Sequence, residues 1–366
     1  MVIKYLSKIS PAKLRGVALV RLDFNAKDGW RMDAALPTMS ILRKNARAVL
    51  VVSHRGRPKG FDRRLSLRQQ AVALSRKMGH PVAFLGKFDF PGIQRIISGA
   101  APGSVFLLEN IRFLDSEFTP EPELAKELAG LADYYVNDAF PVNHHRGDSI
   151  CLIEDYLPSY AGLQLEKEMK SLSGVMKSPR HPLVLIVGGA KTSDKLEVVK
   201  NLYDKADAIL FGGTAASTIL KASGIDVGRS LVDERADMKY LARLAKSKKV
   251  FLPVDWAKEK NAIYDIGPKT EELYAQKIKS ARTIVWSGPM GLIEKEKFSL
   301  GNLAVAEAIA NNKKAFSITG GGETVSFLKE HKLDKKFGFI STGGGAMLDY
   351  LAGEKLPGIE ALKRSK

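Results

Sequence analysis

The sequence predicts an α/β protein of two doubly wound parallel-sheet lobes that a helix joins, with a cleft between them that closes about a hinge. Three observations predict this class. Short runs rich in Val, Ile and Leu alternate along the chain with helical patterns, as in parallel sheets covered on both faces. The chain has 366 residues, more than one hydrophobic core usually serves. A break in composition near the middle separates two similar series of strands and helices.

Nine apolar runs are predicted to be strands. In chain order they are 17–22, 48–52, 105–108, 134–136, 183–187, 208–211, 250–252, 283–286 and 315–318. The helical patterns between them include 36–46, 67–78, 122–131, 193–202, 235–245, 303–310 and 324–330. A strand, a turn and a helix thus repeat in the order that is typical of a Rossmann-like lobe.

The boundary between the lobes is expected within residues 161–182. Apolar residues at helical spacing predict a helix that begins near Leu163, and the breaker Ser178-Pro179-Arg180-His181-Pro182 ends it. We therefore expect a first lobe over residues 1–162, a connecting helix and hinge over 163–182, and a second lobe over 183–350.

Composition narrows the classes of partner. Lys and Arg number 57 against 40 Asp and Glu, which gives a net charge of +17 and favours a polyanionic or phosphorylated partner. The excess is spread over both halves without a basic arm, so we expect no nucleic acid as partner. No apolar run approaches the roughly 18 residues of a membrane-spanning helix, and the single Cys151 cannot form an internal disulfide. We expect a cytoplasmic protein without a membrane partner.

Polar side chains follow the strands of the first lobe. Run 17–22 leads into Asp23-Phe24-Asn25, run 48–52 into Ser53-His54-Arg55-Gly56-Arg57, and run 105–108 into Glu109-Asn110-Ile111-Arg112. Run 134–136 leads on to His144-His145-Arg146. The carboxyl ends of parallel strands meet at one edge of a sheet, and arginine forks pair with carboxylate or phosphate. The sequence therefore predicts a pocket for a small, multiply charged anion.

Glycine follows the strands of the second lobe instead. The clusters are Gly188-Gly189-Ala190-Lys191, Gly212-Gly213-Thr214, Ser287-Gly288-Pro289-Met290-Gly291, Gly320-Gly321-Gly322-Glu323-Thr324 and Ser341-Thr342-Gly343-Gly344-Gly345. Glycine lets backbone N–H groups approach a phosphate closely, and a following helix adds its positive end. Lys191 and Lys195, four residues apart at the start of a helix, are expected on one helical face, within reach of phosphoryl oxygens.

An anion pocket on one lobe and a nucleotide pocket on the other predict phosphoryl transfer. This chemistry needs positioning and charge neutralisation by Lys, Arg and Mg²⁺ more than covalent participation. Neither a Walker-type loop nor a dinucleotide fingerprint occurs, so the nucleotide pocket belongs to another class.

The ordered motifs are specific enough to resemble a known family, phosphoglycerate kinase. They are Arg21-x-Asp23-Phe24-Asn25, Arg31 before Ala34-Ala35-Leu36-Pro37-Thr38, Ser53-His54-x-Gly56-Arg57-Pro58, Leu108-Glu109-Asn110-x-Arg112-Phe113, Gly188-Gly189-Ala190-Lys191-x-x-Asp194-Lys195, Leu252-Pro253-Val254-Asp255, Asp265-x-Gly267-Pro268-x-Thr270, Trp286-x-Gly288-Pro289-Met290-Gly291 and Leu356-Pro357-Gly358-Ile359. They occur in the family's order and span nearly the whole chain.

The resemblance implies reversible transfer between 1,3-bisphosphoglycerate and ADP, giving 3-phosphoglycerate and ATP, with Mg²⁺. It implies catalytic roles for Arg31 and Lys191 on the transferring phosphoryl group. It implies that phosphoglycerate is held by Asp23, Asn25, Arg31, His54, Arg57, Arg112 and Arg146. Nucleotide contacts are expected from Lys191, Lys195, Gly212, Gly213, Glu294, Gly320, Gly321, Gly322, Glu323 and Thr324, with Glu323 as the metal ligand. Residues 351–366 are expected to pack back on the first lobe, and nothing requires more than a monomer.

The chain departs from the family pattern at three positions. Glu323 stands where the family usually has Asp, and Ser287 stands where it has Asn. Without gaps, His145 occupies the family's arginine position, and Arg146 could supply the guanidinium only through a local shift. Three function classes follow: an active phosphoglycerate kinase, a relative that binds ligand without turnover, and a nucleic-acid-binding protein that only the charge suggests.

Overall fold

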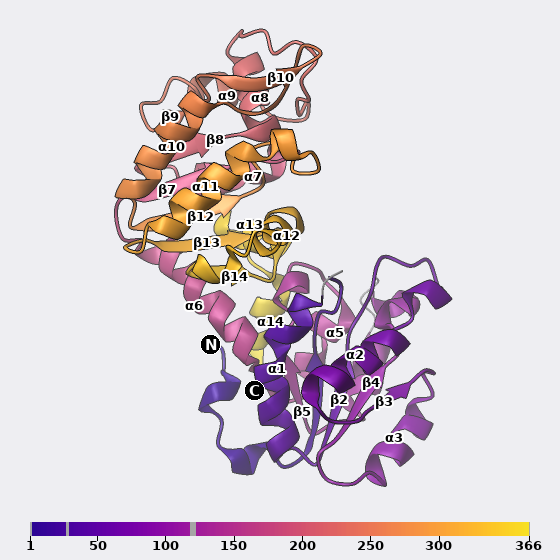
Figure 1. Cartoon of the computed structure of the whole chain (residues 1–366). Helices are drawn as coiled ribbons and strands as arrows, with labels where there is room; N and C mark the ends of the chain where they lie inside the picture. Colours follow the sequence, from indigo (N-terminus) through magenta and orange to yellow (C-terminus); the bar gives the residue numbers. More distant parts are fainter. Residues whose placement is uncertain (1, 27–28, 118–121, 366) are drawn as a thin grey trace. The chain divides into compact units, whose positions relative to one another are not determined.

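The computed structural model describes residues 2–26, 29–117 and 122–365. The chain divides into two compact units, the first reaching Lys170 and including the residues from Lys355 onward, the second covering Ser171–Glu354. Helix α6 (Leu163–Lys177) contributes residues to both units (Figure 1). None of the described helices combines the length and the apolar character needed to cross a bilayer.

The first unit is built on a parallel six-stranded sheet in the order β3-β4-β2-β1-β5-β6. Its strands are β1 (Val17–Arg21), β2 (Ala48–Val52), β3 (Val82–Leu85), β4 (Ser104–Leu108), β5 (Tyr134–Asn137) and β6 (Ser159–Ala161). Strands β1, β2 and β5 are buried at every position, as expected for parallel strands with both faces covered.

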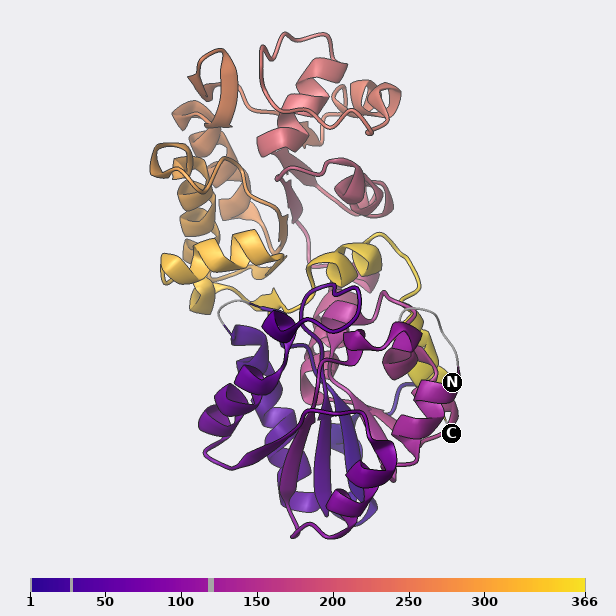
Figure 2. The same cartoon turned by 90° about the vertical axis from the view of Figure 1, so that its right-hand side faces the viewer.

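Helices cover both faces of this sheet (Figure 2). Helices α1 (Trp30–Asn45) and α2 (Arg68–Met78) pack on one face, and α3 (Phe90–Ser98) and α4 (Pro122–Ala129) pack on the other. The short helix α5 (Asp148–Cys151) contacts α14 (Pro357–Arg364), which brings the C-terminal part of the chain back to the first unit.

The second unit repeats this plan with a parallel sheet in the order β14-β13-β12-β7-β8-β9. Its strands are β7 (Leu183–Val187), β8 (Ala208–Phe211), β9 (Val250–Phe251), β12 (Thr283–Ser287), β13 (Phe316–Gly320) and β14 (Phe339–Ser341). Strands β10 (Trp256–Glu259) and β11 (Ala262–Ile266) form a separate antiparallel pair. The helices are α7 (Ser193–Leu202), α8 (Gly213–Ala222), α9 (Met238–Leu244), α10 (Pro268–Ser280), α11 (Leu300–Asn311), α12 (Gly322–Glu330) and α13 (Gly344–Leu351).

The predicted fold class is confirmed, since two parallel sheets carry helices around them. Helix α1 begins earlier than the predicted start at residue 36 and runs through Pro37. Gly29 adopts a left-handed φ of 68°, and its carbonyl accepts hydrogen bonds from the N–H groups of Met32 and Asp33. This earlier start places Arg31 in the first turn of α1.

Candidate functional site

The polar loops of the first unit lie at the carboxyl ends of its central strands. Because β1, β2 and β5 are parallel neighbours in register, the residues that follow them emerge at the same edge of the sheet. The hydrogen bond from the N–H of Phe24 to Ser53 Oγ (3.1 Å) ties two of these loops together. The sequence-based expectation of one shared edge therefore matches the register of the strands.

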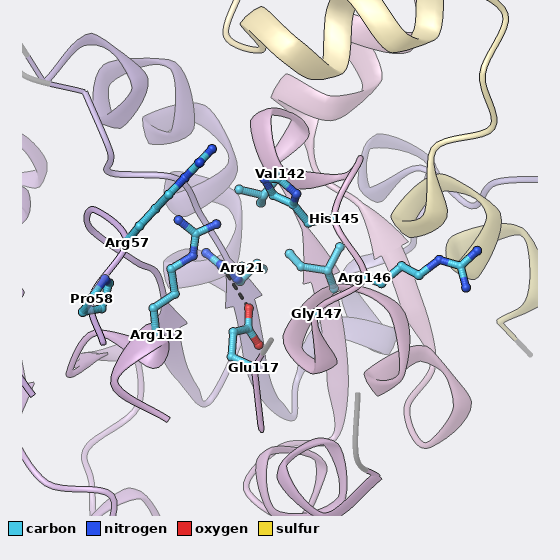
Figure 3. A pocket seen from close by; sticks show the side chains of 10 residues that line it. Arg21, Arg57, Pro58, Arg112, Glu117, Val142, His145, Arg146 and Gly147 are labelled. Atoms are coloured by element: carbon cyan, nitrogen blue, oxygen red, sulfur yellow. Dashed lines mark ion pairs between the residues drawn. The ribbon is translucent and has the colours of Figure 1, made fainter. Parts of the chain in front are cut away.

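A cavity of about 520 Å³ opens among these loops (Figure 3). Its lining residues are Arg21, Arg57, Pro58, Arg112, Glu117, Val142, His145, Arg146, Gly147 and Ile150. Figure 3 shows the guanidinium group of Arg112 beside Arg21, and the Arg57 side chain extends past them in this view. Three guanidinium groups with one carboxylate leave an excess of positive charge, which suits a multiply charged anion.

Arg21 ends strand β1 and is almost fully buried, with 1% of its side chain exposed. Its charge is balanced by Glu117, whose carboxylate lies 3.5 Å from Arg21 Nη2. The Nε–H of Arg21 donates to Ser149 Oγ at 2.9 Å, and Glu117 accepts hydrogen bonds from the hydroxyl and N–H of Ser149 at 2.7 and 3.0 Å. This network fixes Arg21 at the floor of the cavity. Arg21 belongs to the strand-end motif 21–25 that the sequence singled out, whereas Glu117 was not predicted.

His54 is held against Arg21, with its Nδ1 3.4 Å from both terminal guanidinium nitrogens. A guanidinium can only donate, so Nδ1 is the acceptor, and the neutral ring carries its proton on Nε2. Burial, and then the charges of Arg21 and Arg112, lower the pKa of His54 well below its usual value. His54 is therefore uncharged at neutral pH.

Arg112 lies on the 3₁₀ turn Ile111–Phe113 and donates from Nη1 to the carbonyl of Gly56 at 2.8 Å. Burial, and then the charge of Arg21, lower its pKa to about 10. The Arg112 guanidinium stays cationic at neutral pH but is poorly solvated. Pairing with an anion would therefore cost it little further desolvation. Arg57 is exposed by contrast, although it also lines the cavity.

Asp23, Asn25 and Arg31 form a second group beside the cavity. Arg31 Nη1 lies 3.1 Å from Asp23 Oδ2 and 3.3 Å from the carbonyl oxygen of Asn25. The Asn25 side chain accepts from the N–H of Gly56 at 3.0 Å, which joins this group to the loop that carries Arg57. Arg31 does not line the cavity itself, although its charge contributes to lowering the pKa of His54.

The predicted role of Arg146 is not supported by the direction of its side chain. The residue borders the cavity, but Figure 3 shows its guanidinium pointing away from the other arginines, whereas the ring of His145 faces them. The N–H of His145 donates to the carbonyl of Val142 at 3.0 Å, which closes a turn just before Arg146. In this structure the Arg146 guanidinium lies away from the other arginines, and a substrate contact from either His145 or Arg146 stays a prediction.

The second unit contains two cavities at its glycine loops. The larger, of about 520 Å³, is lined by residues that include Gly213, Glu294 and Glu323. The smaller, of about 390 Å³, is lined by Lys195, Ser287, Gly288, Gly320, Gly321, Gly322, Glu323, Thr324, Gly344 and Leu348. Glu323 borders both of them. Most of the predicted nucleotide residues are thus gathered at one end of this sheet.

The glycines of this region serve two different purposes. A Cβ on Gly212 would come within 2.6 Å of Met290 Sδ, so Gly212 allows a close contact between two loops. Gly321, with a φ of 96°, and Gly322 differ, because a Cβ added at either would have no atom within 4 Å and their backbones face open space. The N–H groups at the start of α12 can therefore approach a phosphate closely.

The two lysines do not lie as predicted. Helix α7 begins at Ser193, so Lys191 precedes it, and the expectation of one shared helical face is wrong. Lys191 is exposed, whereas Lys195 is buried and donates from Nζ to the carbonyl of Lys191 at 3.2 Å. Burial lowers the pKa of Lys195. A desolvated ammonium among glycines is a strong partner for phosphate oxygens.

Glu323 lies in the first turn of α12, exposed at both cavities. Glu323 and Lys195 both line the smaller cavity. A carboxylate is the hard oxygen ligand that Mg²⁺ prefers, and Mg²⁺ is usually held by one or two carboxylates together with substrate phosphates. The residues present fit that mode of binding.

Comparison with known proteins agrees with this geometry. The family model described as phosphoglycerate kinase matches residues 15–354. The chain belongs to the phosphoglycerate kinase family. It is 41% identical over 375 residues to the phosphoglycerate kinase of Dictyoglomus turgidum, covering 94% of this chain and 95% of the relative. It is 42% identical over 382 residues to that of Thermosipho africanus, covering 95% of each chain.

Solved structures of phosphoglycerate kinases share the fold. That of Coxiella burnetii matches with a TM-score of 0.86 at 33% identity over 100% of each chain. That of Pyrococcus horikoshii OT3 matches with a TM-score of 0.87 at 30% identity over 99% of each chain. Membership of the phosphoglycerate kinase family places the chain among the phosphotransferases that use a carboxyl group as acceptor.

Proposed function

We propose that the chain catalyses reversible phosphoryl transfer between 1,3-bisphosphoglycerate and ADP, giving 3-phosphoglycerate and ATP. The observation that carries the proposal is the cavity at the strand ends of the first unit, where Arg21, Arg57 and Arg112 converge. Phosphoglycerate has a carboxylate at one end and a phosphate at the other, and guanidinium forks suit both groups. Family membership supports the same substrate.

The first unit binds and orients the phosphoglycerate in this proposal. Arg57 and Arg112 neutralise its charge, and Arg21 is held in place from below by Glu117 and Ser149. Arg31, in the first turn of α1, is positioned by Asp23 and would stabilise charge on the transferring group. The positions of these groups before substrate arrives reduce the reorganisation that the reaction requires.

The second unit would bind the nucleotide. Gly320–Gly322 and the start of α12 offer backbone N–H groups to its phosphates, and Lys195 adds a buried positive charge. Glu294 borders the larger cavity, where the ribose and base would lie. Lys191 is exposed, and its long side chain would reach the phosphoryl group from the nucleotide side.

Glu323 would hold Mg²⁺ together with the phosphates of the nucleotide, at the border of the two cavities. When bound, Mg²⁺ supplies neutralisation of the charge on the phosphates. In-line transfer also requires the two ligands to meet and water to be kept out. We therefore predict closure of the two units about a hinge at residues 163–182. A monomeric state and a cytoplasmic location also stay predictions, and the single cysteine supports the cytoplasmic location.

Steady-state transfer from ATP to 3-phosphoglycerate in the presence of Mg²⁺ tests the proposal. Lys191→Ala should lose turnover, because its charge is needed most in the transition state. Lys200→Ala is the matched control, since Lys200 is an exposed lysine of α7 that pairs with Glu197. Equal turnover in Lys191→Ala and the wild type would contradict the proposed mechanism. Binding of 3-phosphoglycerate without any turnover would identify the chain as a relative that has lost catalysis.

A further inference from the structure

The cavity lined by Arg21, Arg57 and Arg112, called the arginine cavity below, also contains the titratable side chain of His145. The surroundings of this side chain set its charge state. The ring of His145 faces Arg57 and Arg112 from the loop that precedes α5 (Figure 3). The residue is half-buried, and its ring centroid lies 3.9 Å from that of His144. Its backbone is fixed by hydrogen bonds to Val142 and from Cys151 Sγ, the latter at 3.3 Å. The ring is therefore held where it can respond to charge in the cavity.

The groups around His145 come from every element that surrounds the cavity. Strand β1 supplies Arg21, the loop after β2 supplies His54 and Arg57, the turn 111–113 supplies Arg112, and the turn 115–117 supplies Glu117. His144 and Arg146 adjoin it in the chain, and Cys151 lies behind it. Among the described lining residues Glu117 is the one carboxylate, and it already serves Arg21 and Ser149. Positive charge thus dominates.

This environment keeps His145 neutral while the cavity holds no anion. Burial first, then His144 and the charges of Arg112, Arg57 and Arg21, lower its pKa to about 4. At neutral pH the imidazole thus contributes a dipole and a hydrogen-bonding ring, but no net charge.

We propose that His145 takes up one proton from solvent when phosphoglycerate enters the cavity, so that it becomes a cationic ligand of the substrate only in the loaded state. The proposal rests on the proposed function, because that function supplies the anion. A carboxylate and a phosphate together bring two to three negative charges to a site where three guanidinium groups had opposed protonation. Against the three guanidinium groups and Glu117, these charges bring the cavity to neutral or slightly negative, which removes the opposition to the imidazolium.

A consequence for substrate binding follows from linkage. If the bound state holds a proton that the free state lacks, the affinity for 3-phosphoglycerate rises as pH falls, by up to about tenfold per pH unit for one proton. This pH dependence is expected between two pKa values of His145: about 4 in the free protein, and the higher pKa in the complex with 3-phosphoglycerate. Protonation of the substrate phosphate acts in the opposite direction, so the effect of His145 appears as a difference between the wild type and a variant.

Calorimetric titration with 3-phosphoglycerate at pH 6.5, in two buffers of different ionisation enthalpy, counts the protons taken up. We expect the wild type to take up between about 0.3 and 1 proton more than His145→Gln and His145→Arg, which cannot titrate there. His144→Gln is the matched control and should retain the uptake. Equal proton counts in the wild type and both His145 variants, with binding intact, would overturn the proposal.

A second readout needs no variant for its main result. Of the six histidines in the chain, one should shift from the neutral to the protonated ¹⁵N signature when 3-phosphoglycerate saturates the wild type at neutral pH. Saturation without such a shift would overturn the proposal while leaving the proposed function intact. Failure of the wild type to bind 3-phosphoglycerate at all would overturn the proposed function, and the proton uptake with it.

Discussion

The buried ion pair between Arg21 and Glu117 offers the sharpest test of how the cavity is built. Their side chains are 1% and 5% exposed, and 3.5 Å separates Nη2 from Oε1. Substitution Glu117→Gln removes the balancing charge but keeps an oxygen that can accept from Ser149. It leaves the guanidinium of Arg21 buried without a counter-charge. That group would then have to be accommodated at a free-energy cost.

The size of this cost follows from the geometry. Loss of one partner of a buried pair destabilises proteins by about 3–5 kcal/mol, and the retained acceptor favours the lower end. For a unit of this size a change of about 3 kcal/mol corresponds to a fall of roughly 6–12 °C in Tm. The double variant Arg21→Met with Glu117→Gln also removes the second charge. It should recover part of the lost free energy of unfolding, because no isolated buried charge remains.

Urea unfolding followed by circular dichroism measures the loss, and hydrogen exchange of the β1 amides assigns it to the first unit. Asp62→Asn is the matched control, because Asp62 pairs with Arg64 at the surface, where Arg64 is 89% exposed. We expect no resolvable change for this control. A loss for Glu117→Gln that is no larger than that of Asp62→Asn would refute the reasoning. A double variant less stable than Glu117→Gln alone would do the same.

Three further predictions concern the site. In steady-state kinetics, Arg112→Ala should raise the KM for 3-phosphoglycerate by at least tenfold and leave the KM for ATP nearly unchanged. A change in the KM for ATP alone would mean that 3-phosphoglycerate binds elsewhere. Glu323→Asp should alter the Mg²⁺ concentration for half-maximal rate, measured by metal titration, and an identical Mg²⁺ response would remove the carboxylate from the metal site. Because the pKa of His54 is lowered in the native state, the unfolded chain binds a proton at about pH 6 that the native state does not. The contribution of His54 to stability is therefore full above about pH 6.5, and the free energy of unfolding falls by up to about 1.4 kcal/mol per pH unit below it. Denaturation curves of His54→Gln should show a weaker loss of stability at acid pH, and an unchanged loss would contradict a neutral His54.

The central strands could be predicted from sequence because burial on both faces requires unbroken apolar runs. The strands 48–52, 183–187 and 208–211 have the predicted bounds, and most others differ by one or two residues. Strand β3 escapes prediction because it lies at a sheet edge, is short and is only partly buried. The antiparallel pair β10 and β11 escapes it because the segment lacks a clear alternating pattern.

The sequence predicted the site only as far as the ends of the strands determine where the loops that carry the site residues lie. The loops after β1 and β2 meet as expected, because parallel register brings them to one edge. The direction of a single side chain depends on local turns, and for that reason the sequence could not show that the ring of His145, and not the guanidinium of Arg146, faces the arginines. Helix α7 has the predicted bounds, 193–202, so the burial of Lys195 beside an exposed Lys191 depends on tertiary packing that the sequence does not show. Arg21 needs tertiary contacts to explain it, since its partners Glu117 and Ser149 are distant in sequence.

Binding of 3-phosphoglycerate to Arg57→Ala tests the central claim most directly, namely that the substrate occupies the arginine cavity of the first unit. Arg57 lines the cavity but is exposed, so its removal should leave the fold intact. Arg64→Ala, another exposed arginine of this unit, is the matched control. Calorimetry should show at least tenfold weaker binding for Arg57→Ala and an unchanged Kd for Arg64→Ala. Equal affinity in the wild type and Arg57→Ala would contradict the account.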